Sequence, residues 1–231
     1  MYTLCKLALV GILLPGSSGA VITYIDVAPS NTTNLPPADG STVGNWRGRG
    51  AGLNQGTSNF GNEGGVYEAT AGQGEATVTD LVTTVAVPNG SYEVYVFFWS
   101  DRINQADDWD ITTGLVGSPS LQYTTTTAGV FAINSTTQAT PATTVTGLNV
   151  LGQAGDGNGY SDFVDGNRTL YAAPIGTAVV SSGQFQIDVD GSSLTAGRTW
   201  YDGIGYTLIP EPSSALLTGL GLIALLRRRR S

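Results

Sequence analysis

The stretch Ser91-Tyr92-Glu93-Val94-Tyr95-Val96-Phe97-Phe98-Trp99 decides the fold of this chain. Every second side chain belongs to one face, which consists of Tyr92, Val94, Val96 and Phe98. A period of two, in a run rich in aromatic and β-branched residues, predicts a β-strand. The other face begins with Glu93 and ends with Trp99. Both faces of the predicted strand therefore become apolar toward its end.

Short runs of the same kind recur through residues 21–209, which have almost no helical periodicity. Besides 91–99, we predict strands at 21–27, 66–70, 109–115, 120–126, 130–134, 144–150, 169–173, 184–189 and 199–209. An earlier run that ends at Val87 is joined to 91–99 by Pro88-Asn89-Gly90, and Asn-Gly between two periodic runs predicts a hairpin. Many short strands separated by glycine-rich turns predict an all-β sandwich. Two glycine-rich stretches, 44–65 and 152–168, are predicted as long loops.

The composition of the 231 residues excludes several classes of activity. The chain has no histidine and one cysteine, so it can form neither a Ser-His-Asp nor a Cys-His catalytic site, nor a disulfide framework. It has 18 acidic and 10 basic residues, and this acidity argues against nucleic-acid binding, which requires a basic face. Residues 21–209 alone hold 17 acidic and 5 basic residues and carry a net charge of −12, which repels anionic polymers.

Residues 1–20 have the pattern of a secretory signal peptide. The positive charge of Lys6 precedes an apolar run, and small residues end the segment at Ala20. We expect cleavage there, so that Val21 begins the mature chain. Cys5 lies before the apolar run and is removed with the signal, which leaves the mature chain without a thiol. A buried N-terminal helix is the alternative interpretation.

The C-terminal residues 210–231 have three parts. The motif Pro210-Glu211-Pro212 holds the chain extended because proline fixes φ, and an extended segment is a shape that a protease can read. Residues 213–226 are a predicted transmembrane helix, short for a bilayer but compensated by snorkelling arginines and local thinning. The cluster Arg227, Arg228, Arg229 and Arg230 then stops translocation and stays on the cytoplasmic side.

This tail resembles the PEP-CTERM sorting signal, which combines a Val/Ile-Pro-Glu-Pro motif, a glycine- and leucine-rich transmembrane helix and terminal arginines. The resemblance implies that a membrane-embedded exosortase recognises the tail and cleaves near 210–212. It also implies a Gram-negative bacterium that makes extracellular polymeric substance, with the protein first anchored in the inner membrane and then placed in the cell envelope, extracellular matrix or biofilm. An ordinary tail anchor is the alternative.

Three stretches carry a second resemblance: Gly90-Ser91-Tyr92-Glu93-Val94-Tyr95-Val96, then Trp109-Asp110-Ile111, and finally Thr199-Trp200-Tyr201-Asp202-Gly203-Ile204-Gly205-Tyr206. Their arrangement resembles the galactose-binding-like jelly rolls of carbohydrate-binding modules. The resemblance implies one jelly-roll-like β-sandwich domain over 21–209, closed by a late strand. Jelly rolls host many unrelated functions, so no ligand follows from the fold.

Exposed aromatic rings stack on sugar rings while neighbouring polar groups bond the hydroxyls, and two places in the sequence offer this combination. Trp46 with Arg47 lies in the first glycine-rich stretch, and Trp109 precedes Asp110. These are the candidate residues for binding extracellular polysaccharide. Packing of both tryptophans in the core is the open alternative, and it is the favoured interpretation for Trp200.

A structural calcium ion is a second candidate ligand. Asp156, Asn158 and Asp162 begin with the spacing of an EF-hand loop, but the later positions of that loop do not match. The acidic residues around Asp110 are the other option for calcium. In both places, solvated turn residues are the alternative, and no further cofactor is expected.

We expect no enzymatic activity. Hydrolysis of glycans by two carboxylates needs no histidine, but the acidic residues are scattered without a motif. The sequence thus predicts an exported, non-enzymatic protein that binds or structures extracellular polysaccharide. A purely structural matrix protein without a glycan ligand is the first alternative, and a carboxylate-dependent glycan hydrolase is a lesser one.

Overall fold

The computed structural model describes residues 21–37, 41–49, 66–70, 79–101, 110–126, 129–132, 143–144, 150–151, 164–165, 168–191 and 198–210. These residues form strands and turns, and none of them belongs to a helix. The prediction of an all-β body is confirmed for the residues that the structure describes. The strands form two sheets, and all their pairings are antiparallel except that of β1 with β12.

The larger sheet has ten strands, with the order β11-β14-β7-β16-β5-β4-β3 and with β1, β12 and β13 attached beside that path. Its strands are β1 (Ile22–Asp26), β3 (Thr42–Val43), β4 (Trp46–Arg49), β5 (Val66–Thr70), β7 (Gly90–Asp101), β11 (Thr143–Thr144), β12 (Val150–Leu151), β13 (Val164–Asp165), β14 (Arg168–Val180) and β16 (Arg198–Leu208). The predicted strand 91–99 is therefore a central strand, β7, between β14 and β16.

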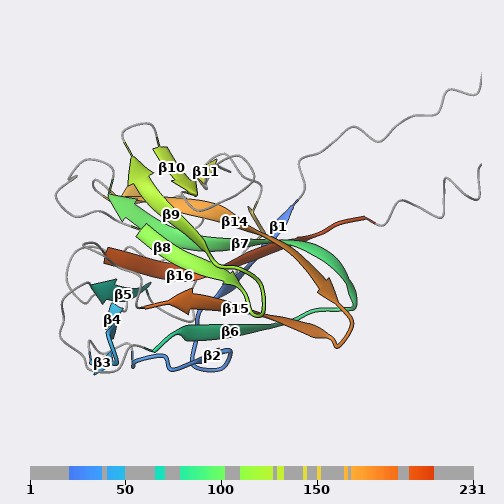
Figure 1. Ribbon diagram of the computed structural model, residues 1–231, viewed down its shortest axis with the longest axis horizontal. Coiled ribbons are helices and arrows are strands. Elements are labelled where there is room, and N and C mark those ends of the chain that lie inside the picture. The colour runs from blue at the N-terminus through green and yellow to red at the C-terminus, as the bar shows by residue number, and fades with distance from the viewer. Residues whose placement is uncertain are drawn as a thin grey trace, which may run out of the picture.

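The smaller sheet has six strands in the order β10-β9-β8-β15-β6-β2. They are β2 (Thr32–Thr33), β6 (Leu81–Ala86), β8 (Asp110–Leu115), β9 (Leu121–Thr126), β10 (Gly129–Ala132) and β15 (Gln184–Asp190). Figure 1 shows β8, β9 and β15 in front of the long strands β7, β14 and β16.

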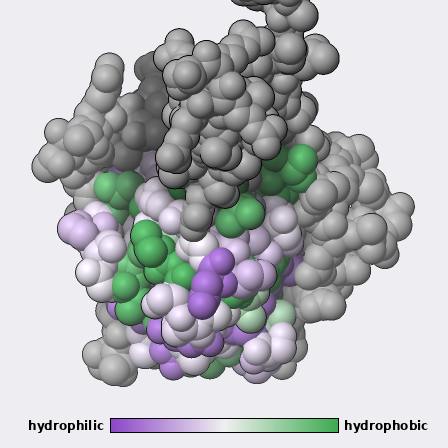
Figure 2. All heavy atoms as spheres, turned by 90° about the vertical axis from the view of Figure 1, so that its right-hand side faces the viewer, coloured by the Kyte–Doolittle hydropathy of each residue, from purple (hydrophilic) through white to green (hydrophobic). Residues whose placement is uncertain are grey.

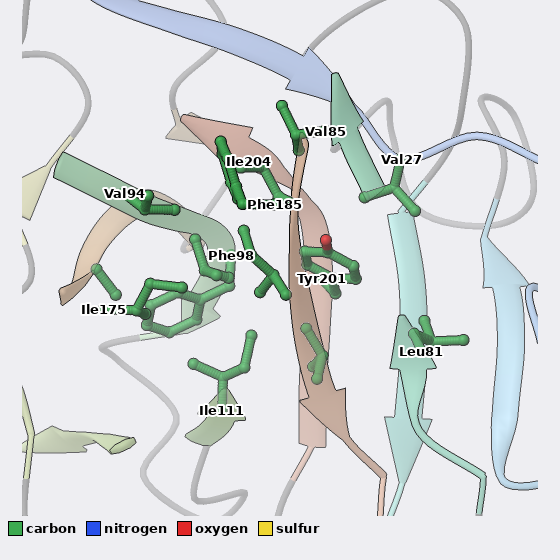
Figure 3. Packing of buried hydrophobic residues seen from close by; sticks show 14 of the residues in the cluster. Val27, Leu81, Val85, Val94, Phe98, Ile111, Ile175, Phe185, Tyr201 and Ile204 are labelled. Carbon is green, nitrogen blue, oxygen red and sulfur yellow. The ribbon is translucent and has the colours of Figure 1, made fainter. Parts of the chain in front are cut away.

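The main hydrophobic core is built from both sheets. The ten-stranded sheet contributes Val94, Phe98 and Tyr201, and the other sheet contributes Ile111 and Phe185, all of which are buried. Figure 3 shows side chains of the two sheets directed toward one another in this cluster. Burial of large apolar side chains is the dominant favourable contribution to folding, so the contact between the sheets stabilises the sandwich.

The predicted hairpin between β6 and β7 is wrong. These strands lie in different sheets, since β6 pairs with β15 and β2 while β7 pairs with β14 and β16. The chain crosses between the sheets at 87–89, and it crosses back at 181–183 between β14 and β15. The two crossings are joined by hydrogen bonds from the Val87 amide to the Gly183 carbonyl (2.9 Å) and from the Gly183 amide to Asn89 Oδ1 (3.0 Å). Asn89-Gly90 therefore turns the chain, but β6 and β7 do not pair with each other. Instead β7 pairs with β14 and β6 pairs with β15, and the second crossing joins β14 to β15.

A β-bulge in β16 changes which side chains share a face. The register to β7 shifts between Tyr201 and Gly203, so that Asp202 is the additional residue. Trp200 consequently shares a face with Gly203 and Gly205, opposite to the face of Tyr201. The alternation predicted across 199–209 holds on each side of the bulge but not through it.

A second buried cluster lies on the face of the ten-stranded sheet that points away from the main core. Its residues alternate along the strands with residues of the main core, and they are Ile22, Tyr24, Val66, Phe97, Trp99, Leu170, Ala172 and Trp200. The glycines of β16 make room for this cluster, because a Cβ atom on Gly205 would lie 2.5 Å from Phe97 Cε2. Burial on both faces explains why β7 becomes apolar on both sides.

Several predicted segments lie outside the described residues. They include the signal peptide 1–20 and all of the tail beyond Pro210, with its transmembrane helix 213–226. In the described ranges, no helix is suited to crossing a membrane. The prediction of one long loop over 44–65 is wrong at its start, where Trp46–Arg49 form β4 between β3 and β5.

Candidate functional site

Trp46 is not available for stacking on a sugar. Its side chain is fully buried in the main core, and its indole Nε1 donates a hydrogen bond to the Thr79 carbonyl oxygen at 2.8 Å. Trp46 lies on β4 opposite Ala69 of β5, whose side chain is also buried. Of the two interpretations open for this residue, the structure supports core packing, and the requirement for an exposed ring is not met.

Arg47 is exposed, as a binding residue requires. It stands opposite Glu68 in the pairing of β4 with β5, and on the other side of Glu68 is Trp200 of β16. Glu68 is only 3% exposed, and its Oε1 lies 3.3 Å from Nη1 of Arg198, whose side chain is 37% exposed. A buried carboxylate is costly unless it is paired, so we expect Arg198 to be held in the ion pair with Glu68. Arg47 and Arg198 thus place two guanidinium groups on one face of an acidic domain.

Asp202, at the bulge of β16, is a buried carboxylate that accepts hydrogen bonds from two side chains. The Tyr24 hydroxyl donates to its Oδ1 at 2.5 Å, and the Trp99 indole N–H donates to its Oδ2. The same hydroxyl lies 3.4 Å from Oδ1 of Asp26, which is also buried. Burial, with the charges of Asp202 and Asp26 second and third, raises the pKa of Tyr24 well above its usual value, so Tyr24 remains a donor. Only 1% of Asp202 is exposed, so its carboxylate is not accessible to a ligand. Its hydrogen bonds with Tyr24 and Trp99 stabilise the bulge of β16.

Three carboxylates lie near the C-terminal end of β15. Asp188 and Asp190 lie on this strand, and Asp80 immediately precedes β6, its pairing partner. Burial, followed by repulsion from Asp190, raises the pKa of Asp80, and burial is also the first cause of a raised pKa for Asp188. Among the described residues no group of three acidic or cysteine side chains has the arrangement to hold a metal ion. This cluster is therefore a site of like-charge repulsion.

The remaining predicted site residues are placed only in part. Asp110 begins β8, with its backbone opposite Thr124 of β9. Pro210 is exposed just after the last strand. Outside the described residues lie Trp109, the calcium candidates Asp156, Asn158 and Asp162, the motif residues Glu211 and Pro212, and the cluster Arg227, Arg228, Arg229 and Arg230.

Sequence reasoning missed the ion pair of Glu68 with Arg198 and gave Asp202 only a minor role. A signal for Asp202 is present in the sequence, since a lone carboxylate between Tyr201 and Gly203 interrupts an apolar strand. No comparable signal points to Glu68, because its partner is 130 residues away. Comparison of the chain with protein-family models, with curated proteins and with solved structures found no match.

Proposed function

We propose that this chain is an exported, non-enzymatic protein of the cell envelope or extracellular matrix, delivered through its C-terminal tail. In this proposal a membrane-embedded exosortase processes the tail near 210–212, after the helix 213–226 has held the protein in the inner membrane. The β-sandwich, which we infer to be jelly-roll-like, is the part that is delivered. The absence of histidine, and of cysteine beyond Cys5, supports a binding or structural role over catalysis.

One structural observation supports the proposal: the last strand that the structure describes ends just before the proline motif. Among the described residues the last strand, β16, stops at Leu208, and the amide of Ile209 donates the last backbone hydrogen bond, to the Ser91 carbonyl oxygen at 2.8 Å. Pro210 is exposed and has left the sheet. A processing enzyme needs an extended, accessible substrate, and the first residue of the motif, Pro210, is exposed and follows the last described strand.

The test is replacement of Pro210, Glu211 and Pro212 by alanine in the full-length chain, followed by fractionation of the producing cells. The proposal predicts that full-length protein accumulates in the inner membrane and that little reaches the exterior. A matched control replaces Pro36 and Pro37, which lie in the folded body, and should not change sorting. Unchanged release of the tail variant would show that the tail is an anchor without a sorting function.

Binding of extracellular polysaccharide rests on Arg47 together with Arg198, and on Trp109 and Asp110. Arginine side chains can bond the hydroxyls or carboxylates of a glycan, and the two guanidinium groups lie on one face. Arg47→Ala should reduce retention of the protein on a neutral exopolysaccharide, with Trp46→Phe as the control because that ring is buried. The burial of Trp46 removes one predicted stacking residue and favours the second candidate function, a structural matrix protein. Equal retention of Arg47→Ala and the unaltered protein would support that second function.

A further inference from the structure

One end of the sandwich, which we call the corner end, combines four features of the chain. Both crossings between the sheets, 87–89 and 181–183, lie there. The described chain also enters and leaves at this end, because Thr23 of β1 stands opposite Tyr206 of β16 in an antiparallel pair. Continuing this register places Val21 beside Leu208. Figure 1 shows the crossings, the start of β1 and the end of β16 toward the right-hand side of the molecule.

Exposed large apolar side chains concentrate at the corner end. Six such residues occur among the described residues, and four of them are Val179 (80% exposed), Leu208 (57%), Val21 (38%) and Ile209 (37%). Val179 stands opposite Ser91 of β7, and Leu208 stands opposite the neighbouring Tyr92. Ser91 and Tyr92 lie on opposite faces of β7, so Val179 belongs to the outer face of the sheet, whereas Leu208 and Val21 belong to the face of the main core. With strands about 4.8 Å apart, the three residues span roughly 15 Å along the end of the sheet, on its two faces. Figure 2 looks onto this end and shows several apolar areas on it.

The corner end is also free of charge within the described residues. The segments 21–25, 86–92, 116–123, 174–187 and 203–210 contain no Asp, Glu, Lys or Arg. The first charged side chain is Glu93, two residues along β7 from Ser91. Residues 21–209 carry a net charge of −12, so an uncharged end is the part of this body that an anionic surface repels least.

The predicted membrane segment starts close to this end. Three residues lie between Ile209 and position 213, and the four residue steps from 209 to 213 span at most about 14 Å in an extended chain. A tether this short gives the corner end an effective concentration at the bilayer surface of about the millimolar range, so weak apolar contacts are sufficient to hold it there.

We propose that the corner end rests on the surface of the bilayer while the tail is intact, with Val179, Leu208 and Ile209 in the headgroup region of the lipids. The proposal rests on the membrane attachment given under Proposed function. It adds an orientation: the sandwich stands on its corner end, and the far end, with Arg47 and Arg198, is turned to the surroundings. The lipid contacts are lost when the tail is cut.

The test uses the full-length chain in vesicles that contain anionic lipid. Because Cys5 is the one cysteine, a Cys5→Ser chain can carry a single fluorescent label at a chosen position. Val179→Cys places the label at the corner end. Val43→Cys is the matched control, because Val43 is also an exposed strand valine (37%) and lies in the row of Thr199, nine residues from Leu208 along β16 or about 30 Å. Lipids with a nitroxide headgroup quench only labels that reach the bilayer surface.

We expect nitroxide lipid to quench the label of Val179→Cys and to leave that of Val43→Cys unchanged, in vesicles with which both variants float. Adding Leu208→Glu should reduce the quenching of the Val179→Cys label without releasing the protein, because the new carboxylate is repelled by anionic lipid. Equal quenching of the two labels, or none, in floating protein overturns the orientation alone. Protein that does not float with vesicles overturns the membrane attachment as well. In detergent, a shift of the emission wavelength of the Val179→Cys label that grows with protein concentration would contradict the proposal. It would show that this end contacts a second copy of the chain instead of lipid.

Discussion

Gly205→Ala tests the packing of the second buried cluster, and the sign of its effect distinguishes two arguments. In a strand interior, glycine is about 0.5–1 kcal/mol less favourable than alanine, so propensity alone predicts that the substitution stabilises the protein. The structure predicts the opposite. A Cβ on Gly205 would lie 2.5 Å from Phe97 Cε2 and 2.6 Å from Ile22 Cγ2, which is about 1 Å closer than ordinary contact.

The neighbours of that Cβ have little room to move. Phe97 is fully buried and is held in edge-to-face contact with Tyr24, at a centroid distance of 5.0 Å, and Ile22 is 3% exposed. Overpacking of this kind costs about 1–3 kcal/mol. We therefore expect Gly205→Ala to lower the free energy of unfolding by about 1–2 kcal/mol after the gain in propensity, as measured by urea unfolding followed by tryptophan fluorescence.

A double-mutant cycle identifies the cause. Phe97→Leu removes ring atoms at the point of conflict, so the two substitutions together should cost less than the sum of the single effects. Strict additivity, or a stability gain from Gly205→Ala alone, would refute the placement of Phe97 over β16 and with it the face assignment that follows the bulge at Asp202.

Three further predictions concern charge, core and pH. Asp80→Asn should raise stability at neutral pH by roughly 0.5 kcal/mol, because it removes the cost of desolvating the carboxylate and, second, its repulsion from Asp190. The pKa of Asp80 is raised in the folded state, so the gain should vanish near pH 3, where unfolding curves of both proteins should coincide. Trp46→Phe should cost about 1–3 kcal/mol in a denaturant titration, because the Thr79 carbonyl loses its donor; an unaffected midpoint would place the indole elsewhere. Burial raises the pKa of Tyr67 from 10.0 to about 12, so stability that is present below pH 10 should fall as the pH rises toward 12, and Tyr67→Phe should move this alkaline unfolding to higher pH; a circular-dichroism pH titration that is identical for both proteins would contradict it.

The strands themselves were predictable because their signal is local. The alternation of 91–99 and the runs at 184–189 and 199–209 correspond to β7, β15 and β16. In β7 and β15 apolar side chains stand at every second position, and in β16 they do so on each side of the bulge at Asp202. This pattern requires no knowledge of the partner strand. The all-β class followed from the same pattern.

Pairing and faces could not be predicted, because they depend on distant residues. Asn89-Gly90 has the form of a hairpin turn, yet it becomes a crossing between sheets because β14 and β15 supply better partners for β7 and β6. The bulge at Asp202 inverts the face of Gly203, and it depends on Tyr24 and Trp99, which bind that carboxylate from elsewhere in the chain.

The candidate site was predicted only in part, for a related reason. Trp46 and Arg47 are neighbours in a glycine-rich stretch, and the sequence does not distinguish a loop from the short strand β4. Once the stretch pairs with β5, alternation sends Trp46 into the core and Arg47 to the surface. The tail motif required no such knowledge, because its prolines, apolar run and arginines are contiguous.

The central claim, delivery through a processed tail, is tested most directly by intact mass spectrometry of the protein recovered from outside the producing cells. The account predicts a chain that begins at Val21 and ends near Pro210-Glu211-Pro212, without the apolar run or the four arginines. Recovery of a chain that still ends at Ser231 outside the cells, or of none outside the inner membrane, would contradict it.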